Sequence, residues 1–127
     1  MLDDVFLKQY IEFLTIAKKK FGHLALLDKD FNIIFISDLA LVSFQDAIEE
    51  DVIGLNFIKE IPRPIHLITK KQKILNEVLH LKEPRMYIAI ASHNQYKYRK
   101  VVICASPICN PETKNVIHFM WTILDLT

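Results

Sequence analysis

The side chains that could bind a metal ion do not form a recognisable site in this sequence. No two of the five histidines have a spacing typical of a metal centre. Cys104 and Cys109 lie on and just after one predicted strand, and no third ligand accompanies them. We interpret the two cysteines as apolar core residues rather than as a disulfide or half of a zinc site.

Residues that could act in catalysis are equally isolated. A nucleophile needs a base positioned beside it, yet Ser106 precedes Pro107 at a predicted strand end with no motif around it. Gly22 and Gly54 are the only glycines, so the sequence has no glycine-rich phosphate loop. We therefore predict that the protein is not an enzyme.

The overall composition is that of one ordinary globular domain. The chain has 127 residues, of which 51% are hydrophobic, enough to bury a core. A formal net charge of +1 argues against direct nucleic-acid binding. No signal peptide or membrane-length apolar segment is visible, so we expect a cytoplasmic protein without membrane association.

The strongest structural signal is a hairpin near the end of the chain. The first predicted strand is Val101–Ala105, a β-branched apolar run that Ser106 and Pro107 should end. Residues 110–115 are of the types that form turns, and the second predicted strand follows them over Val116–Leu126. The second strand is apolar at odd and even positions alike. A strand with one wet face would alternate, so we expect both faces to be covered.

The other predicted elements complete an α+β fold. Leu67, Ile68, Lys71, Ile74, Leu75, Val78 and Leu79 recur at helical spacing, which predicts one long helix over Ile65–Lys82. Short helices are predicted over 39–44, capped by Asp38, over 46–52, capped by Asp46 and ended by Gly54, and over 56–61. Further strands are predicted over 24–27, 33–36 and 85–92. This order predicts a five-stranded antiparallel sheet with helices on one face.

An amphipathic helix is predicted over Val5–Lys20, ahead of the sheet. Its apolar stripe, wider than one packing surface needs, contains Phe6, Leu7, Tyr10, Ile11, Phe13, Leu14, Ile16 and Ala17. The stripe can pack on its own domain, on the same helix of a second subunit, or on both. We divide the chain into this helical segment, residues 1–22, and a sheet domain, residues 23–127, and expect a homodimer through the helix and the outer sheet face.

From residue 21 onward the chain resembles a PAS domain. Leu26–Ser37 is similar to the opening hairpin of that family, and Glu49–Phe57 is similar to its helical segment that ends in Ile-Gly. Ala105–Ile108 and Trp121–Thr127 are similar to its last hairpin, which closes with Asp-Leu-Thr. The resemblance implies a pocket between sheet and long helix, dimerisation, and signalling to an output domain. The pattern is similar to sensory domains ahead of helix-turn-helix output in LuxR-type regulators. We expect a stand-alone module or a sensory part whose output domain is missing from this chain.

Cofactors known from the PAS family can be compared with these residues one at a time. The flavin-photosensor motif Asn-Cys-Arg-Phe-Leu does not occur, no cysteine precedes Val101, and Ile123 stands where that subfamily has glutamine. Pro64 stands where photoactive yellow protein has its chromophore-bearing cysteine. Haem would need an axial ligand such as His66 or His80 on the long helix, and we interpret both as surface residues. The cofactor therefore stays unknown.

A small apolar pocket, or a closed core, remains as the expected site. Its expected lining consists of Phe35, Phe44, Phe57, Ile61, Leu75, Ile88, Ile90, Ile103, Trp121 and Ile123. We predict a non-catalytic sensory and dimerisation module of a bacterial signalling or transcriptional regulator. Its core pocket either binds a small apolar ligand or is filled by the protein's own side chains. The alternative is a small-molecule carrier or small enzyme of unrelated α+β architecture, which a buried polar cluster inside the cavity would favour.

Overall fold

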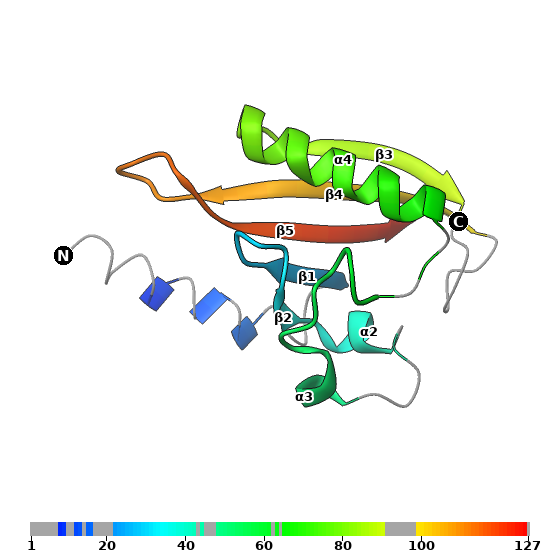
Figure 1. Cartoon of the computed structure of the whole chain (residues 1–127). Helices are drawn as coiled ribbons and strands as arrows, with labels where there is room; N and C mark the ends of the chain where they lie inside the picture. Colours follow the sequence, from blue (N-terminus) through cyan, green and yellow to red (C-terminus); the bar gives the residue numbers. More distant parts are fainter. Residues whose placement is uncertain are drawn as a thin grey trace.

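The protein folds around one antiparallel sheet of five strands in the order β2-β1-β5-β4-β3 (Figure 1). The computed structural model describes residues 8–9, 12–13, 15–16, 22–42, 44, 48–61, 63, 65–90 and 99–126. The strands are β1 (His23–Leu27), β2 (Ile33–Ile36), β3 (Arg85–Ile90), β4 (Lys100–Cys109) and β5 (Val116–Asp125). Every neighbouring pair is antiparallel, which confirms the predicted fold class.

Three labelled helices follow the first hairpin, and the longest of them crosses one face of the sheet (Figure 1). They are α2 (Asp38–Leu41), α3 (Glu49–Val52) and α4 (Ile65–Leu81). The predicted long helix is thus confirmed to within one residue at its end. The predicted helical piece over 56–61 is wrong, because this segment is a series of turns.

The predicted N-terminal helix falls mostly on residues outside the described part of the chain. Those that are described, residues 8–9, 12–13 and 15–16, are helical. Phe13 and Ile16 from its apolar stripe are 37% and 59% exposed. The predicted cap at Asp46 also lies outside the described residues.

A serine hydroxyl joins α2 to the first strand. The Ser37 side chain is fully buried, and its Oγ accepts hydrogen bonds from the backbone N–H groups of Leu24, at 3.0 Å, and Ala40, at 3.3 Å. It donates in turn to the carbonyl oxygen of Gly22 at 2.7 Å. Ser37, rather than the predicted Asp38, therefore caps α2, and it fixes α2 against the start of β1.

The turns before α4 are held against β2 by backbone and side-chain hydrogen bonds. Gly54 adopts a φ of +96°, a conformation that favours glycine, and its N–H donates to the Ile33 carbonyl at 2.7 Å. Asn56 donates through Nδ2 to Asn32 Oδ1 at 3.1 Å, and its Oδ1 accepts from the Ile58 N–H at 3.1 Å. These bonds replace the helix that the sequence pattern predicted.

Strand β4 is longer than predicted, because it continues through Ser106 and Pro107 to Cys109. Pro107 pairs with Phe119 of β5. On the other side of β4, the pairing with β3 extends only as far as Ala105, which lies opposite Arg85, the first residue of β3, so β4 has an open edge beyond that point. A proline lacks the N–H that a ladder needs, and an edge position tolerates this loss. A bulge between Ile108 and Cys109 ends the regular pairing.

The two faces of the sheet differ in how they are covered. The inner face packs with α4 into the core, which includes Ala105, Phe119 and Trp121. On the outer face, Leu24 and Leu26 of β1 are buried, with exposures of 2% and 0%. The other half of this face is exposed and apolar, so the prediction that both faces are covered holds for only part of the sheet.

We call that exposed part the outer patch and define it by Met86, Ile88 and Ile90 of β3 and Leu124 of β5. Their exposed fractions lie between 60% and 70%. Val102 of β4 joins the two strands of the patch, because it pairs with both Ile88 and Leu124. The patch is therefore continuous across three strands.

Candidate functional site

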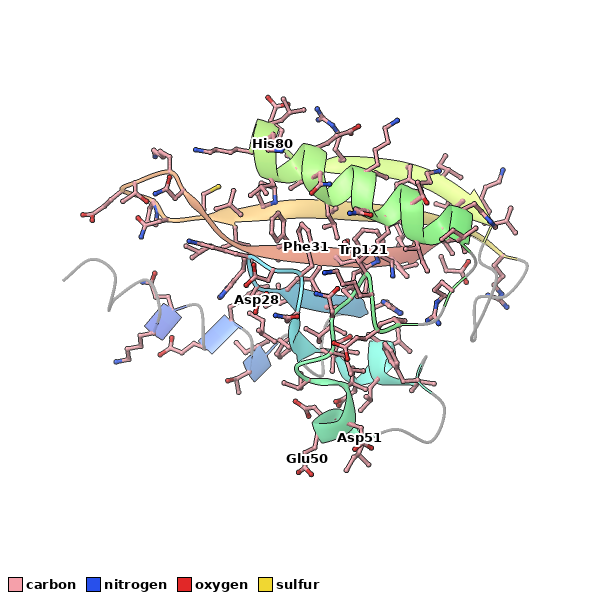
Figure 2. All side chains as sticks on the ribbon, viewed as in Figure 1. Asp28, Phe31, Glu50, Asp51, His80 and Trp121 are labelled. Atoms are coloured by element: carbon pink, nitrogen blue, oxygen red, sulfur yellow. The ribbon has the colours of Figure 1, made fainter. Side chains whose placement is uncertain are left out.

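A cavity of about 100 Å³ lies between the inner face of the sheet, α2, α4 and the turns that precede α4. Figure 2 shows Trp121 beneath α4 and His80 near the opposite end of that helix. Most of the wall is apolar. The lining consists of His23, Ala25, Ile33, Ile36, Ala40, Phe44, Phe57, Ile61, Arg63, Leu67, Lys71, Tyr87, Ile103, Trp121 and Ile123.

Six of the ten residues expected in the lining are found there. They are Phe44, Phe57, Ile61, Ile103, Trp121 and Ile123. Phe57 and Trp121 meet edge to face, with ring centroids 5.1 Å apart, and so form a rigid aromatic corner of the wall. Whether these residues bind a ligand remains a prediction.

The other four expected lining residues lie elsewhere. Ile88 and Ile90 were assigned to the wrong face of β3, because the alternation of that strand turns Tyr87 inward and leaves both isoleucines on the outer patch. Phe35 pairs with Leu26 of the outer face, and a register irregularity between Leu26 and Leu27 allows Ile33 and Ile36, which have opposite parity, both to line the cavity. Leu75 is fully buried, but it belongs to the core beside the cavity rather than to the wall.

Lys71 lies on the predicted apolar stripe of α4, and no functional role was predicted for it. It lies one turn after Leu67 on α4, lines the cavity and is only 9% exposed. Its Nζ donates to the carbonyl oxygen of Phe57 at 3.1 Å and lies 3.8 Å from the centroid of the Phe57 ring. Burial, with a smaller contribution from the charge of Arg63, lowers the pKa of Lys71 to about 8.

Three further polar side chains contribute to the cavity wall, and none was predicted there. Burial lowers the pKa of Arg63, which remains a cation at physiological pH. Burial also raises the pKa of Tyr87 to about 12, so its hydroxyl stays neutral and can donate or accept. His23, at the start of β1, is the third. Of the three, only Tyr87 stands within an apolar run of the sequence, so a polar interruption of such a run could have found Tyr87 alone.

The arrangement offers no metal site among the residues that the structure describes, since no group of three potential ligands comes together there. His66 and His80 are exposed, as expected, and neither lines the cavity. Cys104 and Cys109 are half-buried free thiols outside the lining. What the cavity can do is enclose a small, mainly apolar molecule and offer hydrogen bonds from cationic groups.

Comparison with solved structures identifies the fold. The chain is similar to a sensory box sensor histidine kinase from Vibrio cholerae, with a TM-score of 0.68, 12% identity, and coverage of 100% of this chain and 99% of that one. It is similar to the PAS domain of Bordetella pertussis BvgS, with a TM-score of 0.74, 16% identity, and coverage of 94% and 88%. The chain has the PAS fold. No protein-family model and no curated protein sequence matches it.

The chain is also similar to part of a larger protein that was solved in complex with DNA. Vibrio cholerae VqmA, solved as a complex with a ligand and DNA, matches with a TM-score of 0.71 and 14% identity. The match covers 91% of this chain but 50% of VqmA, so the chain spans about half the length of that protein. The resemblance predicted from sequence is thus confirmed at the level of fold, and the alternative of an unrelated α+β architecture is wrong.

The polar groups in the cavity are the feature that we had associated with a carrier or an enzyme. The PAS fold excludes the unrelated α+β architecture that this alternative assumed. The polar groups are nevertheless present in the cavity wall. In the described parts of the chain, no helix is long and apolar enough to cross a bilayer.

Proposed function

We propose that this chain is a non-catalytic sensory and dimerisation module of a bacterial signalling or transcriptional regulator. The observation that supports the proposal is a cavity between the sheet and α4 of a PAS fold, lined mainly by apolar groups. The similar solved proteins include a sensor histidine kinase and a ligand-bound regulator complexed with DNA. In the present chain a small molecule in the cavity would be the stimulus.

The ligand would act by selecting one arrangement of the sheet and α4. Trp121 and Ile123 of β5 face the cavity, whereas Leu124 of the same strand lies on the outer patch. A ligand that binds one arrangement better shifts the population of that arrangement, and the shared backbone of β5 moves both faces together. The signal would leave through the outer patch, the N-terminal helix and the end of β5.

The proposed partner is a second copy of the chain, bound through the outer patch and the N-terminal helix. Met86, Ile88, Ile90 and Leu124 form a continuous apolar surface, which in soluble proteins often marks an interaction site. The exposed Ile16 of the N-terminal helix adds to the apolar surface available for pairing. An output domain attached to this chain would then respond to the geometry of the pair.

A fragment screen on the intact, isotope-labelled protein tests ligand binding. We expect small organic compounds to shift the backbone amide resonances of Ala25 and Trp121 and, through β5, that of Leu124 on the outer patch. The variant Ala25→Leu fills part of the cavity and should abolish these shifts, because Ala25 is buried and lines it.

The matched control is Ala89→Leu, which makes the same change on β3 outside the lining and should retain binding. Binding that survives in Ala25→Leu, or a screen without a single compound that shifts the cavity resonances, would contradict the proposed sensory role.

A further inference from the structure

The charge of the cavity wall is one-sided. Two cationic side chains, Lys71 and Arg63, line the cavity, and no aspartate or glutamate of the described residues does. Their mutual repulsion is one of the causes that lower the pKa of Lys71. A negative charge placed beside Lys71 would offset the cost of burying this ammonium group and the repulsion that it experiences from Arg63.

Lys71 has more hydrogen-bonding capacity than its protein partners use. An ammonium group has three N–H donors, and the Nζ of Lys71 makes one hydrogen bond, to the Phe57 carbonyl, and one contact with the Phe57 ring. No ion pair within the described parts of the chain includes Lys71. Buried lysines are normally paired with an anionic group, so the ammonium group of Lys71 has N–H donors left for a further hydrogen-bond acceptor.

The size of the cavity limits what that acceptor can be attached to. Its volume of about 100 Å³ is smaller than the roughly 150 Å³ of an engineered apolar cavity that takes benzene. Ala25, Trp121 and Ile123 supply apolar parts of the same wall. The body of a fitting molecule is therefore apolar and has only a few carbon atoms.

We infer that the cavity binds a small organic monoanion, a short-chain carboxylate whose apolar tail lies against Trp121 and Ile123 and whose carboxylate receives hydrogen bonds from Lys71, with Arg63 supplying a second positive charge. This inference rests on the proposed sensory function and specifies its ligand class. A second carboxylate at the far end of the molecule would lie against apolar walls, so dicarboxylates should be rejected.

Calorimetric titration of the intact protein at pH 7 with butyrate, its neutral isostere butyramide and the dicarboxylate succinate tests the inference. We expect butyrate to bind at least tenfold more tightly than butyramide and succinate to bind no better than the amide. The carboxylate can accept a charge-assisted hydrogen bond from the ammonium group of Lys71, whereas the amide offers only a neutral acceptor. Equal affinities for butyrate and butyramide, or no measurable binding of butyrate at tens of millimolar, would overturn the inference.

The variant Lys71→Met removes the charge and keeps an apolar chain of similar length, so it should fold and lose the preference for the acid. Lys73→Met makes the same change at an exposed position of α4 and should bind butyrate as the parent does. Thermal unfolding of both variants verifies that they are folded. A Lys71→Met variant that still prefers butyrate tenfold would refute the role of Lys71.

Raising the pH supplies an independent readout. Because the pKa of Lys71 is about 8, its charge is lost between pH 7 and pH 9.5, and butyrate should bind several-fold more weakly at the higher pH. His23, Arg63 and Tyr87 face the same cavity, so the dependence must vanish in Lys71→Met to be assigned to Lys71. A dependence that persists in this variant would contradict the assignment.

The two proposals fail in different ways. If neutral fragments bind in the cavity and butyrate does not, the sensory function stands and the anion inference falls. If no small molecule of either kind binds, the proposed function fails first.

Discussion

The two faces of strands β3, β4 and β5 are built from neighbouring residues but have opposite properties. On the inner face, Tyr87, Ile103 and Trp121 enclose a cavity that also contains a buried ammonium group. On the outer face, Ile88 and Leu124 expose apolar surface to solvent. The inner face thus buries a charge and the outer face exposes hydrocarbon, and each arrangement is unfavourable without a partner.

This difference indicates that residue parity alone separates the two environments of the sheet, and with them the two proposed binding surfaces. Successive side chains of a strand point to opposite faces, so a single strand can contribute to the cavity and to the outer patch without compromise. In β5 the adjacent residues Ile123 and Leu124 serve the two faces in this way. Substitutions at adjacent positions should therefore have separable effects, which the following variants examine.

The largest difference is expected between Trp121→Ala and Leu124→Ala. Trp121 is 4% exposed and packs on Phe57, so its truncation should lower the free energy of unfolding by about 3–5 kcal/mol. Leu124 is 64% exposed, and its truncation should change that free energy by no more than about 0.5 kcal/mol. Urea denaturation followed by circular dichroism measures both. Losses of similar size would show that the two faces are not energetically distinct.

Lys71→Met should stabilise the ligand-free protein at pH 7 by at most about 3 kcal/mol, the equivalent of a pKa lowered from 10.5 to about 8. Below pH 8 the folded and unfolded chains both carry the charge, and the folded chain bears the full cost of burying it. Between pH 8 and 10.5 only the unfolded chain keeps the proton, so the stability of the parent rises with pH in this window. The rise should be missing in Lys71→Met.

Lys73→Met is the control for that experiment, because Lys73 is exposed on the same helix. Its stability profile between pH 7 and 10.5 should follow that of the parent. If Lys71→Met instead destabilises the protein at pH 7, the hydrogen bond to Phe57 and the ring contact outweigh the cost of burial, and the inner face is not under electrostatic strain.

The double variant Ile88→Asp with Leu124→Asp tests the outer patch. It places two carboxylates in one row of the sheet, so it should weaken self-association by at least tenfold, which is about 1.4 kcal/mol. Sedimentation velocity over a range of concentrations measures the change. Ile65→Asp, at a 76% exposed position of α4, is the control and should not alter association. A parent that sediments as a monomer at all concentrations would remove the proposed dimer.

The smallest effect is expected from Tyr87→Phe. Burial raises the pKa of Tyr87 from 10.0 to about 12, so the unfolded chain loses this proton at a lower pH than the folded chain. The parent should therefore lose stability as the pH rises from 10 to 12, and the variant should lose less. Chemical denaturation at pH 9 and pH 11 compares the two. Because Tyr87 is only partly buried, we expect a difference below about 1 kcal/mol.

Much of the fold could be predicted from sequence, because the signals for its long elements are periodic or punctuated by turn residues. The apolar stripe of α4 and the turn before β5 gave bounds within a residue or two of those observed. The strand β3 was harder. Its run Met-Tyr-Ile-Ala-Ile contains no charged residue, so the alternation does not reveal which parity faces inward, and only the pairing with β4 decides it.

The candidate site could be predicted only where it is apolar. Phe57, Trp121 and Ile123 follow from the rule that large apolar residues fill the space between a sheet and a helix. Lys71 has the spacing of a core residue but the chemistry of a surface one, and periodicity alone cannot tell whether such a lysine extends to solvent or stays inside. The tertiary contact with the Phe57 carbonyl, which no local pattern encodes, determines the outcome.

The buried hydroxyl of Ser37 has a consequence for how occupancy of the cavity can be monitored. Ala40, whose N–H binds that oxygen, belongs to the cavity wall, whereas Leu24, whose N–H binds it too, has its side chain on the opposite side of the sheet. We therefore expect a displacement of Ala40 by a bound molecule to alter the hydrogen bond between Ser37 and the start of β1. The hydrogen-exchange rate of the Leu24 amide should then report whether a ligand occupies the cavity, although Leu24 itself does not line the cavity.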